Sequence, residues 1–318
     1  ALMNPIASLV LIRMNGGTAM MRILGIVGVQ ICICVPIIVF QFCKGKEFFS
    51  KEYWGYALRI GIPIVPHYLS GIILNQGDRI MIDKMVGKTE VALYGLAYSI
   101  GMLVQLFISG MNSALTPWMY SKIKKGDIRS MRKVLQLLSV VVVGIAVALM
   151  LISPELVLIF GSPKYREAVY VIPPVAASVF FIFIYNILSM PQFYYEKTQF
   201  LMAASMAAAG ANVVLNFIFI RLFGYIAAGY TTLACYMLYS VGHYIVSKRI
   251  LVNEGIQENL MSPGFLVACS AFLIGASIIC NLIFPYRILR YAILLASAGL
   301  VFWKKELLLK TMADIRKK

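Results

Sequence analysis

The sequence predicts an all-α fold, a polytopic bundle of transmembrane helices, and three observations support this. Of the 318 residues, 61% are hydrophobic and only 13% are charged, whereas soluble domains carry roughly 45–50% apolar and about 25% charged residues. The mean hydropathy is +0.84. The apolar residues form long runs, unlike the strands of a membrane β-barrel, which span about 10 alternating residues. A soluble catalytic domain, a disulfide scaffold and a disordered chain are therefore excluded.

Apolar runs that are long enough to cross a hydrocarbon core of roughly 30 Å, which takes about 20 helical residues, recur along the whole chain. The nine predicted spans are 20–43, 60–82, 91–117, 134–160, 168–195, 199–221, 223–247, 264–284 and 288–303. The stump of a tenth is predicted at 1–12. Because the chain begins within apolar sequence and without Met, we expect the N-terminal part of a longer protein to precede Ala1.

The net charge of +16, from 29 Lys and Arg against 13 Asp and Glu, reflects membrane topology rather than a nucleic-acid partner. The loops after the odd-numbered spans hold 19 basic residues, against 7 in the alternate loops. By the positive-inside rule the first set of loops is cytoplasmic, and so is the C-terminus. The six cysteines lie in or beside apolar runs without a C-x-x-C pair, so we expect no metal site.

Residues 44–58 differ from the apolar segments on either side of them. From Lys44 to Tyr56 the sequence reads KGKEFFSKEYWGY, which mixes lysines and glutamates with aromatic residues. This composition is typical of an amphipathic helix that lies on the membrane surface. We therefore expect a cytoplasmic linker between residues 1–43 and the spans that follow.

The third span, 91–117, has a polar face along its whole length. At helical spacing its polar and small residues fall within a sector of about 80°. They are Tyr94, Tyr98, Gly101, Gln105, Ser109, Asn112 and Thr116. Polar groups are costly in a bilayer unless they face water or a partner. This face therefore predicts a water-lined cavity, with a helix-packing interface as the alternative.

The second span, 60–82, combines two helix-bending prolines with an unusual number of polar groups. Its polar face comprises His67, Gly71, Asn75, Asp78 and Arg79. Asp78 either neutralises a basic neighbour and anchors the helix, or Arg79 faces an anionic ligand. For His67, a hydrogen bond to a neighbouring helix is favoured over a proton relay.

Polar faces on further helices imply an interior that several helices share. The fifth span presents Ser178, Tyr185, Ser189 and Gln192, and the sixth presents Ser205, Asn212 and Asn216. A shared polar interior is the plan of a transporter rather than of an anchor. The sequence contains no P-loop, no H-E-x-x-H motif and no paired carboxylates in a span, so it predicts no enzyme.

Two groups of motifs indicate a family. The first comprises Gly61-Ile62-Pro63 with Pro66, then Asp78-Arg79, then Tyr94 with Ala97-Tyr98. The second comprises Tyr195-Glu196-Lys197-Thr198, then Asn212, Leu215-Asn216 and Gly224–Ala228. Together they resemble motifs of the polysaccharide exporter and O-antigen (Wzx-type) flippase families of the MOP superfamily. The resemblance covers residues 20–303.

The resemblance implies a MATE-like architecture, with two lobes of six helices around a central cavity and two extra C-terminal helices. On this plan residues 1–43 are a remnant of the first lobe and residues 44–58 are the linker. The second six-helix lobe is 59–248, and a cytoplasmic loop at 249–263 leads to the two extra transmembrane helices at 264–303. The basic tail is 304–318.

The resemblance also implies a flippase of the bacterial cytoplasmic membrane, which moves a polyprenyl-pyrophosphate-linked oligosaccharide by alternating access. The expected partners are this lipid and the bilayer, with a polysaccharide polymerase as a further candidate. No cofactor is expected beyond H⁺ or Na⁺ as a coupling ion. The alternatives are a cation-coupled multidrug antiporter and a membrane enzyme that acts on lipid-linked sugars.

An anionic, hydroxyl-rich headgroup needs cations and hydrogen-bonding groups along its path. The candidate substrate-path residues are His67, Asn75, Asp78, Arg79, Tyr98, Gln105, Asn112, Asn212 and Asn216.

Overall fold

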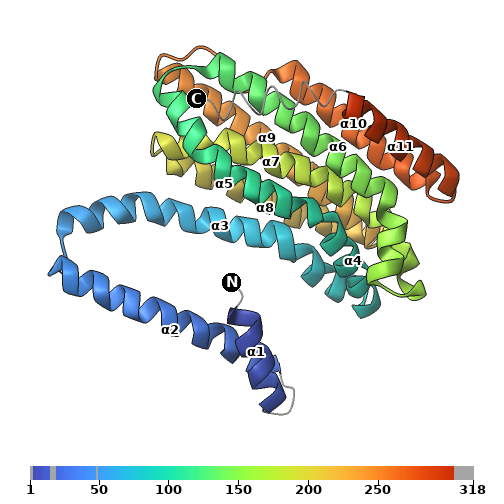
Figure 1. Cartoon of the computed structure of the whole chain (residues 1–318), viewed down its shortest axis with the longest axis horizontal. Helices are drawn as coiled ribbons and strands as arrows, with labels where there is room; N and C mark the ends of the chain where they lie inside the picture. Colours follow the sequence, from blue (N-terminus) through green and yellow to red (C-terminus); the bar gives the residue numbers. More distant parts are fainter. Residues whose placement is uncertain (1–2, 15–18, 48, 304–318) are drawn as a thin grey trace. The chain divides into compact units, whose positions relative to one another are not determined.

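The computed structural model describes residues 3–14, 19–47 and 49–303, and this part of the chain forms helices without a strand. The predicted all-α class is therefore confirmed. Seven helical segments are long and apolar enough to cross a membrane, as in a multi-pass membrane protein. In chain order the helices are α1 (Met3–Met14), α2 (Ala19–Gly45), α3 (Lys51–Met85), α4 (Lys88–Gly101), α5 (Leu103–Lys124), α6 (Ile128–Phe160), the 3₁₀ helix η1 (Pro163–Val171), α7 (Ile172–Tyr194), α8 (Thr198–Phe223), α9 (Ile226–Asn253), α10 (Pro263–Ile283) and α11 (Arg287–Trp303) (Figure 1).

The chain divides into two compact units, Ala1–Arg59 and Ile60–Lys318. In the first unit α1 packs against α2, and the hydroxyl of Ser8 donates to the carbonyl oxygen of Arg22 at 3.2 Å. Gly25 allows this close contact, because a Cβ on it would lie 2.6 Å from Cα of Ser8. Most other side chains of α2 are apolar and exposed, which is typical of a membrane helix.

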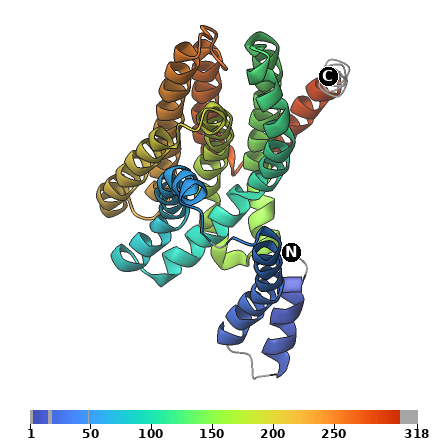
Figure 2. The ribbon, with the colours of Figure 1, turned by 90° about the vertical axis from the view of Figure 1, so that its left-hand side faces the viewer.

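The second unit, called the lobe below, comprises α3 from Ile60 onward and the helices that follow it. Its centre is α7, most of whose side chains are buried and which packs against α4, α5, α6, α9 and α10 (Figure 2). The other helices surround α7: α8 packs mainly on α9, and α10 and α11 pack on α6. The α5–α6, α7–α8 and α9–α10 connections lie at one end of the lobe, and the α8–α9 and α10–α11 connections lie at the other (Figure 1).

Several observed helices differ from the predicted spans. The segment predicted as a separate linker helix is not one, because α2 continues to Gly45 and residues 51–58 form the first turns of α3. Two of the nine predicted spans are not among the seven apolar segments. α11 has only 17 described residues, and the 28-residue α9 is rich in Tyr, Thr and Ser, which lower its hydropathy. The predicted basic tail lies outside the described residues.

The third predicted span is broken at Met102 into α4 and α5. The bend packs closely on α7 at Gly101, where a Cβ would lie 2.7 Å from Cγ1 of Val175. A residue without a side chain is therefore required for this approach. As a result, the predicted polar face does not follow one straight helix. Its N-terminal part, with Tyr94 and Tyr98, is buried in the lobe, whereas Ser109 on α5 is exposed.

Candidate functional site

The carboxylate of Asp78 lies in the interior of the lobe and is completely buried. Three side chains from three helices donate hydrogen bonds to it. Tyr94 on α4 donates its hydroxyl, Asn216 on α8 donates its amide at 2.6 Å, and Thr232 on α9 donates its hydroxyl at 2.6 Å. All three donors are neutral. Asp78 thus connects α3 with α4, α8 and α9 through side-chain hydrogen bonds.

Asn212 and Asn216 extend this network along α8, and both are completely buried. The amide of Asn216 also lies 3.2 Å from Oδ1 of Asn212, and the hydroxyl of Thr231 donates to Oδ1 of Asn216. The amide nitrogen of Asn212 is buried without a hydrogen-bond partner among the described residues. Oxygen atoms of carboxylate, amide and hydroxyl groups therefore gather around Asp78.

Asp78 makes no ion pair with a described residue, although Arg79 follows it in the sequence. Ion pairs elsewhere in the described part of the chain include Lys122–Asp127 and Glu155–Arg290. The guanidinium of Arg79 instead lies 5.3 Å from the ring centroid of Tyr98, and its Nη1 donates to Gln76 at 2.8 Å. Its buried Nε has no hydrogen-bond partner among the residues that the structure describes. The cation is therefore held beside the network without being neutralised by it.

One helical turn before Arg79, Asn75 forms the next polar contact between helices. Its Oδ1 accepts the hydroxyl of Tyr98 at 2.7 Å and that of Tyr236 on α9 at 3.2 Å. Closer to the N-terminal end of α3, Nδ1 of His67 lies 3.1 Å from Oγ of Ser205 and 3.0 Å from the hydroxyl of Tyr239. A continuous polar face of α3 thus meets α4, α8 and α9.

A cavity of about 180 Å³ opens between α3, α7 and α9, next to Asn75 and His67. Its walls include the aromatic rings of Tyr185, Tyr236 and Tyr239. The rings of Tyr185 and Tyr236 are nearly parallel, with centroids 6.4 Å apart, and the centroids of Tyr185 and Tyr239 are 4.5 Å apart. The cavity is therefore aromatic and polar at once. We call it the aromatic cavity.

The structure brings together seven of the nine predicted substrate-path residues. His67, Asn75, Asp78, Arg79, Tyr98, Asn212 and Asn216 all lie in or beside the network just described. The other two, Gln105 and Asn112, lie on α5 beyond the bend at Met102, and their side chains make no hydrogen bond to this network among the described residues. The broken helix is the reason, because it directs the two halves of the predicted polar face to different places.

The contribution of α9 to this site was not predicted from the sequence. Its Thr232, Tyr236, Tyr239 and His243 recur at steps of four, three and four residues, which places them on one face of a helix. His243 is completely buried, and its Nδ1 lies 2.8 Å from Nε2 of Gln192 on α7. The same helical spacing that marked the third span could have identified this face.

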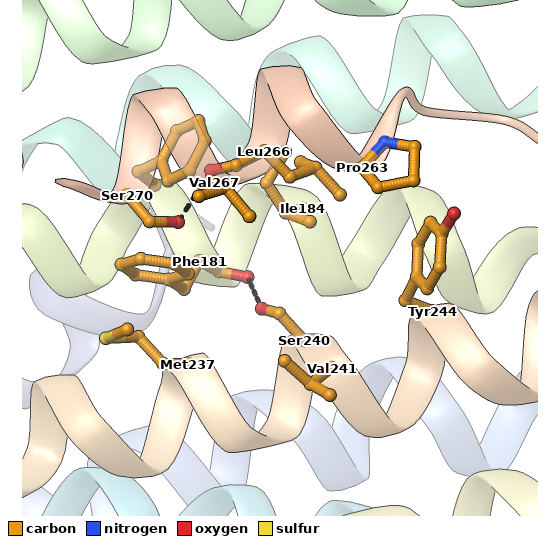
Figure 3. Close-up of a pocket in the computed structure, with 11 residues that line it drawn as sticks. Phe181, Ile184, Met237, Ser240, Val241, Tyr244, Pro263, Leu266, Val267 and Ser270 are labelled. Atoms are coloured by element: carbon orange, nitrogen blue, oxygen red, sulfur yellow. Dashed lines mark hydrogen bonds between the residues drawn. The ribbon is translucent and has the colours of Figure 1, made fainter. Parts of the chain in front are cut away.

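A second hollow lies between α7, α9 and α10 and also measures about 180 Å³ (Figure 3). Phe181, Ile184 and Leu266 form much of its wall. The hydroxyl of Ser240 donates to the carbonyl oxygen of Phe181 at 2.9 Å, and Ser270 donates to that of Leu266 at 2.7 Å (Figure 3). Because the lining hydroxyls of these serines are bonded to backbone, this groove is apolar and contrasts with the aromatic cavity.

Comparisons with known proteins agree with the family that the motifs indicated. Residues 2–124 match the family model described as polysaccharide biosynthesis protein. A protein of the Lsg locus of Haemophilus influenzae is 28% identical over 172 residues, which cover 51% of this chain and 41% of that protein. A membrane protein of the same organism is 29% identical over 167 residues, which cover 49% of this chain and 40% of the relative. No solved structure matches significantly.

The chain therefore spans about two fifths of the length of these relatives. The family match contains the first group of motifs, from Gly61 to Tyr98, and ends before the second group. The predicted resemblance is confirmed where the match lies. The chain is a multi-pass membrane protein that is related, through residues 2–124, to the polysaccharide biosynthesis protein family.

Proposed function

We propose that the protein translocates a polyprenyl-pyrophosphate-linked oligosaccharide across the bacterial cytoplasmic membrane by alternating access, for the biosynthesis of a surface polysaccharide. The observation that supports this most strongly is the buried polar network around Asp78 and Asn75, inside a lobe of otherwise apolar helices. Polar groups at membrane depth are costly unless they line a pathway or meet a partner. The proposed role is translocation and involves no bond-making step.

Arg79 supplies the cation that an anionic headgroup requires. Its guanidinium has no carboxylate partner among the described residues, and its Nε is buried without a hydrogen bond there. Arginine binds phosphate oxygens through two parallel N–H groups, which makes it well suited to a pyrophosphate. We therefore propose that the pyrophosphate passes Arg79 during translocation.

Asp78 is the proposed site of coupling to H⁺ or Na⁺. A carboxylate that is fully buried among neutral donors has no permanent countercharge, so an exchangeable cation can provide one. The hydroxyl oxygen of Thr232, 2.6 Å from the carboxylate, is a further oxygen ligand for such a cation, since hard cations prefer oxygen ligands. Loading and release of the cation at Asp78 would change the contacts between α3, α8 and α9.

We further propose that the C-terminus is cytoplasmic. The α5–α6 connection, where Lys125 follows Lys124 at the end of α5, lies at the end of the lobe toward which α11 runs (Figure 1). Basic residues are enriched in cytoplasmic loops. A polysaccharide polymerase, which would consume the translocated lipid, is the proposed protein partner.

The second candidate is a cation-coupled multidrug antiporter of the same superfamily. The buried carboxylate of Asp78 favours it, because such a transporter needs an acid in the membrane that binds H⁺ or Na⁺. Arg79 argues against it, since a cation beside the path would repel the cationic drugs that such antiporters export.

Deletion of the full-length gene separates the two candidates. For a flippase we expect loss of surface polysaccharide and accumulation of lipid-linked oligosaccharide in the cytoplasmic leaflet. The wild-type gene should restore the polymer, whereas Arg79→Ala should not, at equal membrane levels. Arg287→Ala is the matched control, because Arg287 is exposed on α11. Unchanged polymer with altered drug resistance would instead favour the antiporter.

A further inference from the structure

The lining of the aromatic cavity is suited to a small, uncharged ligand. None of the side chains that line it is charged. Its volume of about 180 Å³ is well above the roughly 10–15 Å³ that one water molecule needs. This is room for one sugar ring. Without a cation in its wall, the cavity also offers nothing to a pyrophosphate.

Three hydrogen-bonding groups in the wall of the aromatic cavity have no partner among the described residues. They are the hydroxyl of Tyr185, the side-chain amide of Asn186 and Nε2 of His67, whose Nδ1 is already engaged by Ser205 and Tyr239. Unpaired polar groups in a partly enclosed site are stabilised when a ligand supplies the missing hydrogen bonds. The hydroxyls of a sugar can both donate and accept such bonds.

The faces of the tyrosine rings in the wall of the aromatic cavity also suit a sugar. Tyr185 and Tyr239 lie 4.5 Å apart between centroids, and Tyr236 lies nearly parallel to Tyr185. Tyrosine combines an apolar face with a polar hydroxyl, so it can pack on the C–H face of a sugar ring and bond to the hydroxyls at its edge. Ligand sites commonly combine an aromatic wall with a few convergent polar groups.

The position of the aromatic cavity relative to Arg79 indicates which sugar it would hold. Asn75 lines the cavity, and Arg79 is four residues further along α3, about 6 Å along the helix axis. Tyr98 links the two, since its hydroxyl bonds to Asn75 and its ring lies beside the guanidinium of Arg79. A pyrophosphate at Arg79 would therefore place the sugar attached to it next to the cavity.

We infer that the aromatic cavity is a specificity subsite for the sugar that is bonded directly to the pyrophosphate of the translocated lipid. Tyr185 and Asn186 would recognise its hydroxyls, and Arg79 would bind the phosphate. This inference rests on the proposed function. It predicts that sugar recognition and phosphate recognition can be removed separately by substitution.

The test compares two lipids on the full-length protein in nanodiscs. One is polyprenyl pyrophosphate, and the other is the lipid-linked oligosaccharide extracted from the deletion strain. We expect the wild-type protein to bind the glycosylated lipid at least about tenfold more tightly, the effect of roughly 1.4 kcal/mol. Asn186→Ala and Tyr185→Phe should remove this preference and leave affinity for polyprenyl pyrophosphate unchanged, whereas Arg79→Ala should weaken both.

The control is Tyr244→Phe, which removes an unpartnered tyrosine hydroxyl from the apolar groove of Figure 3 and should retain the preference. Equal affinity of the wild-type protein for both lipids would overturn the subsite and leave the flippase proposal standing. An equal loss for both lipids in Asn186→Ala would overturn it too, because it would mean a structural role. Failure of the wild-type protein to bind either lipid would overturn both proposals.

Discussion

Two carboxylates in the lobe have opposite surroundings. Asp78 on α3 is completely buried, and the described side chains that donate hydrogen bonds to it, from α4, α8 and α9, are all neutral. Glu155 on α6 is paired with Arg290 on α11 through two hydrogen bonds of 2.8 and 2.9 Å. Tyr291 donates a further hydrogen bond to Glu155 at 2.9 Å. Glu155 thus has a cation as its partner, and Asp78 has none among the described residues.

On the proposed function, the difference separates a structural contact at Glu155 from a transport site at Asp78. The Nη1 atom of Arg290 also donates to the carbonyl oxygen of Leu151 at 2.7 Å, so both Nη atoms of this guanidinium fix α11 to α6. An acid that lacks a countercharge in a low-dielectric interior is costly for folding alone. Its retention at Asp78 is explained when an exchangeable cation binds there during the transport cycle.

Substitution of Asp78 should affect transport most and tests this comparison directly. Asp78→Asn should reduce transport by at least about tenfold, or 1.4 kcal/mol, because an amide can neither exchange a proton nor offer a charge to Na⁺. Glu155→Gln should leave transport per molecule within about twofold, since that acid has a structural partner. Flipping in vesicles with equal amounts of protein measures both. Equal losses in the two variants would remove the distinction.

Replacement of Arg290, the cation that pairs with Glu155, should chiefly affect the stability of the folded protein. Arg290→Ala should lower the free energy of unfolding by about 2–4 kcal/mol, because it leaves Glu155 unpaired; the 25% exposure of the Glu155 side chain keeps the effect below that of a fully buried pair. Thermal unfolding in detergent measures it. Arg287→Ala, at an exposed position on the same helix, should change stability by less than about 0.5 kcal/mol. A similar loss in both variants would contradict the pairing.

The two tyrosines that donate to these acids provide a matched pair. Tyr94→Phe should cost about 1.5–3 kcal/mol, because Asp78 has few donors and no cation to compensate. Tyr291→Phe should cost less than about 1 kcal/mol, since Glu155 keeps both hydrogen bonds from Arg290. The unfolding midpoints of the two purified variants show which substitution lowers stability more. A reversed order would mean that Asp78 does not depend on its neutral donors.

The smallest effect concerns the bend that positions Tyr94. Gly101→Ala should destabilise the lobe by about 1–2 kcal/mol, because the added Cβ would lie 2.7 Å from Cγ1 of Val175. Gly110→Ala on α5 is the control, since a Cβ there meets nothing within 4 Å. It should be neutral or stabilising by up to about 1 kcal/mol. If both variants are equally stable, the bend is not held by close packing at Gly101.

Much of the fold follows from composition and periodicity. Long apolar runs predict the positions of most membrane helices, and the spacing of the polar residues along α3 predicts the polar face of that helix. The bend at Met102 could not be predicted in the same way. It depends on contact between Gly101 and Val175, which are distant in the sequence, and the local sequence of 91–117 is compatible with one continuous helix.

The amino-acid sequence alone is enough to identify a multi-pass, all-helical membrane protein with polar groups at membrane depth, because bilayer solvation imposes length and hydropathy on every span. What those polar groups contact depends on how the helices pack in three dimensions. The partners of Asp78 lie 16, 138 and 154 positions away in the sequence. Helical periodicity shows which face of a helix is polar, but packing between helices decides which faces meet, and therefore which acid has a cation and which does not.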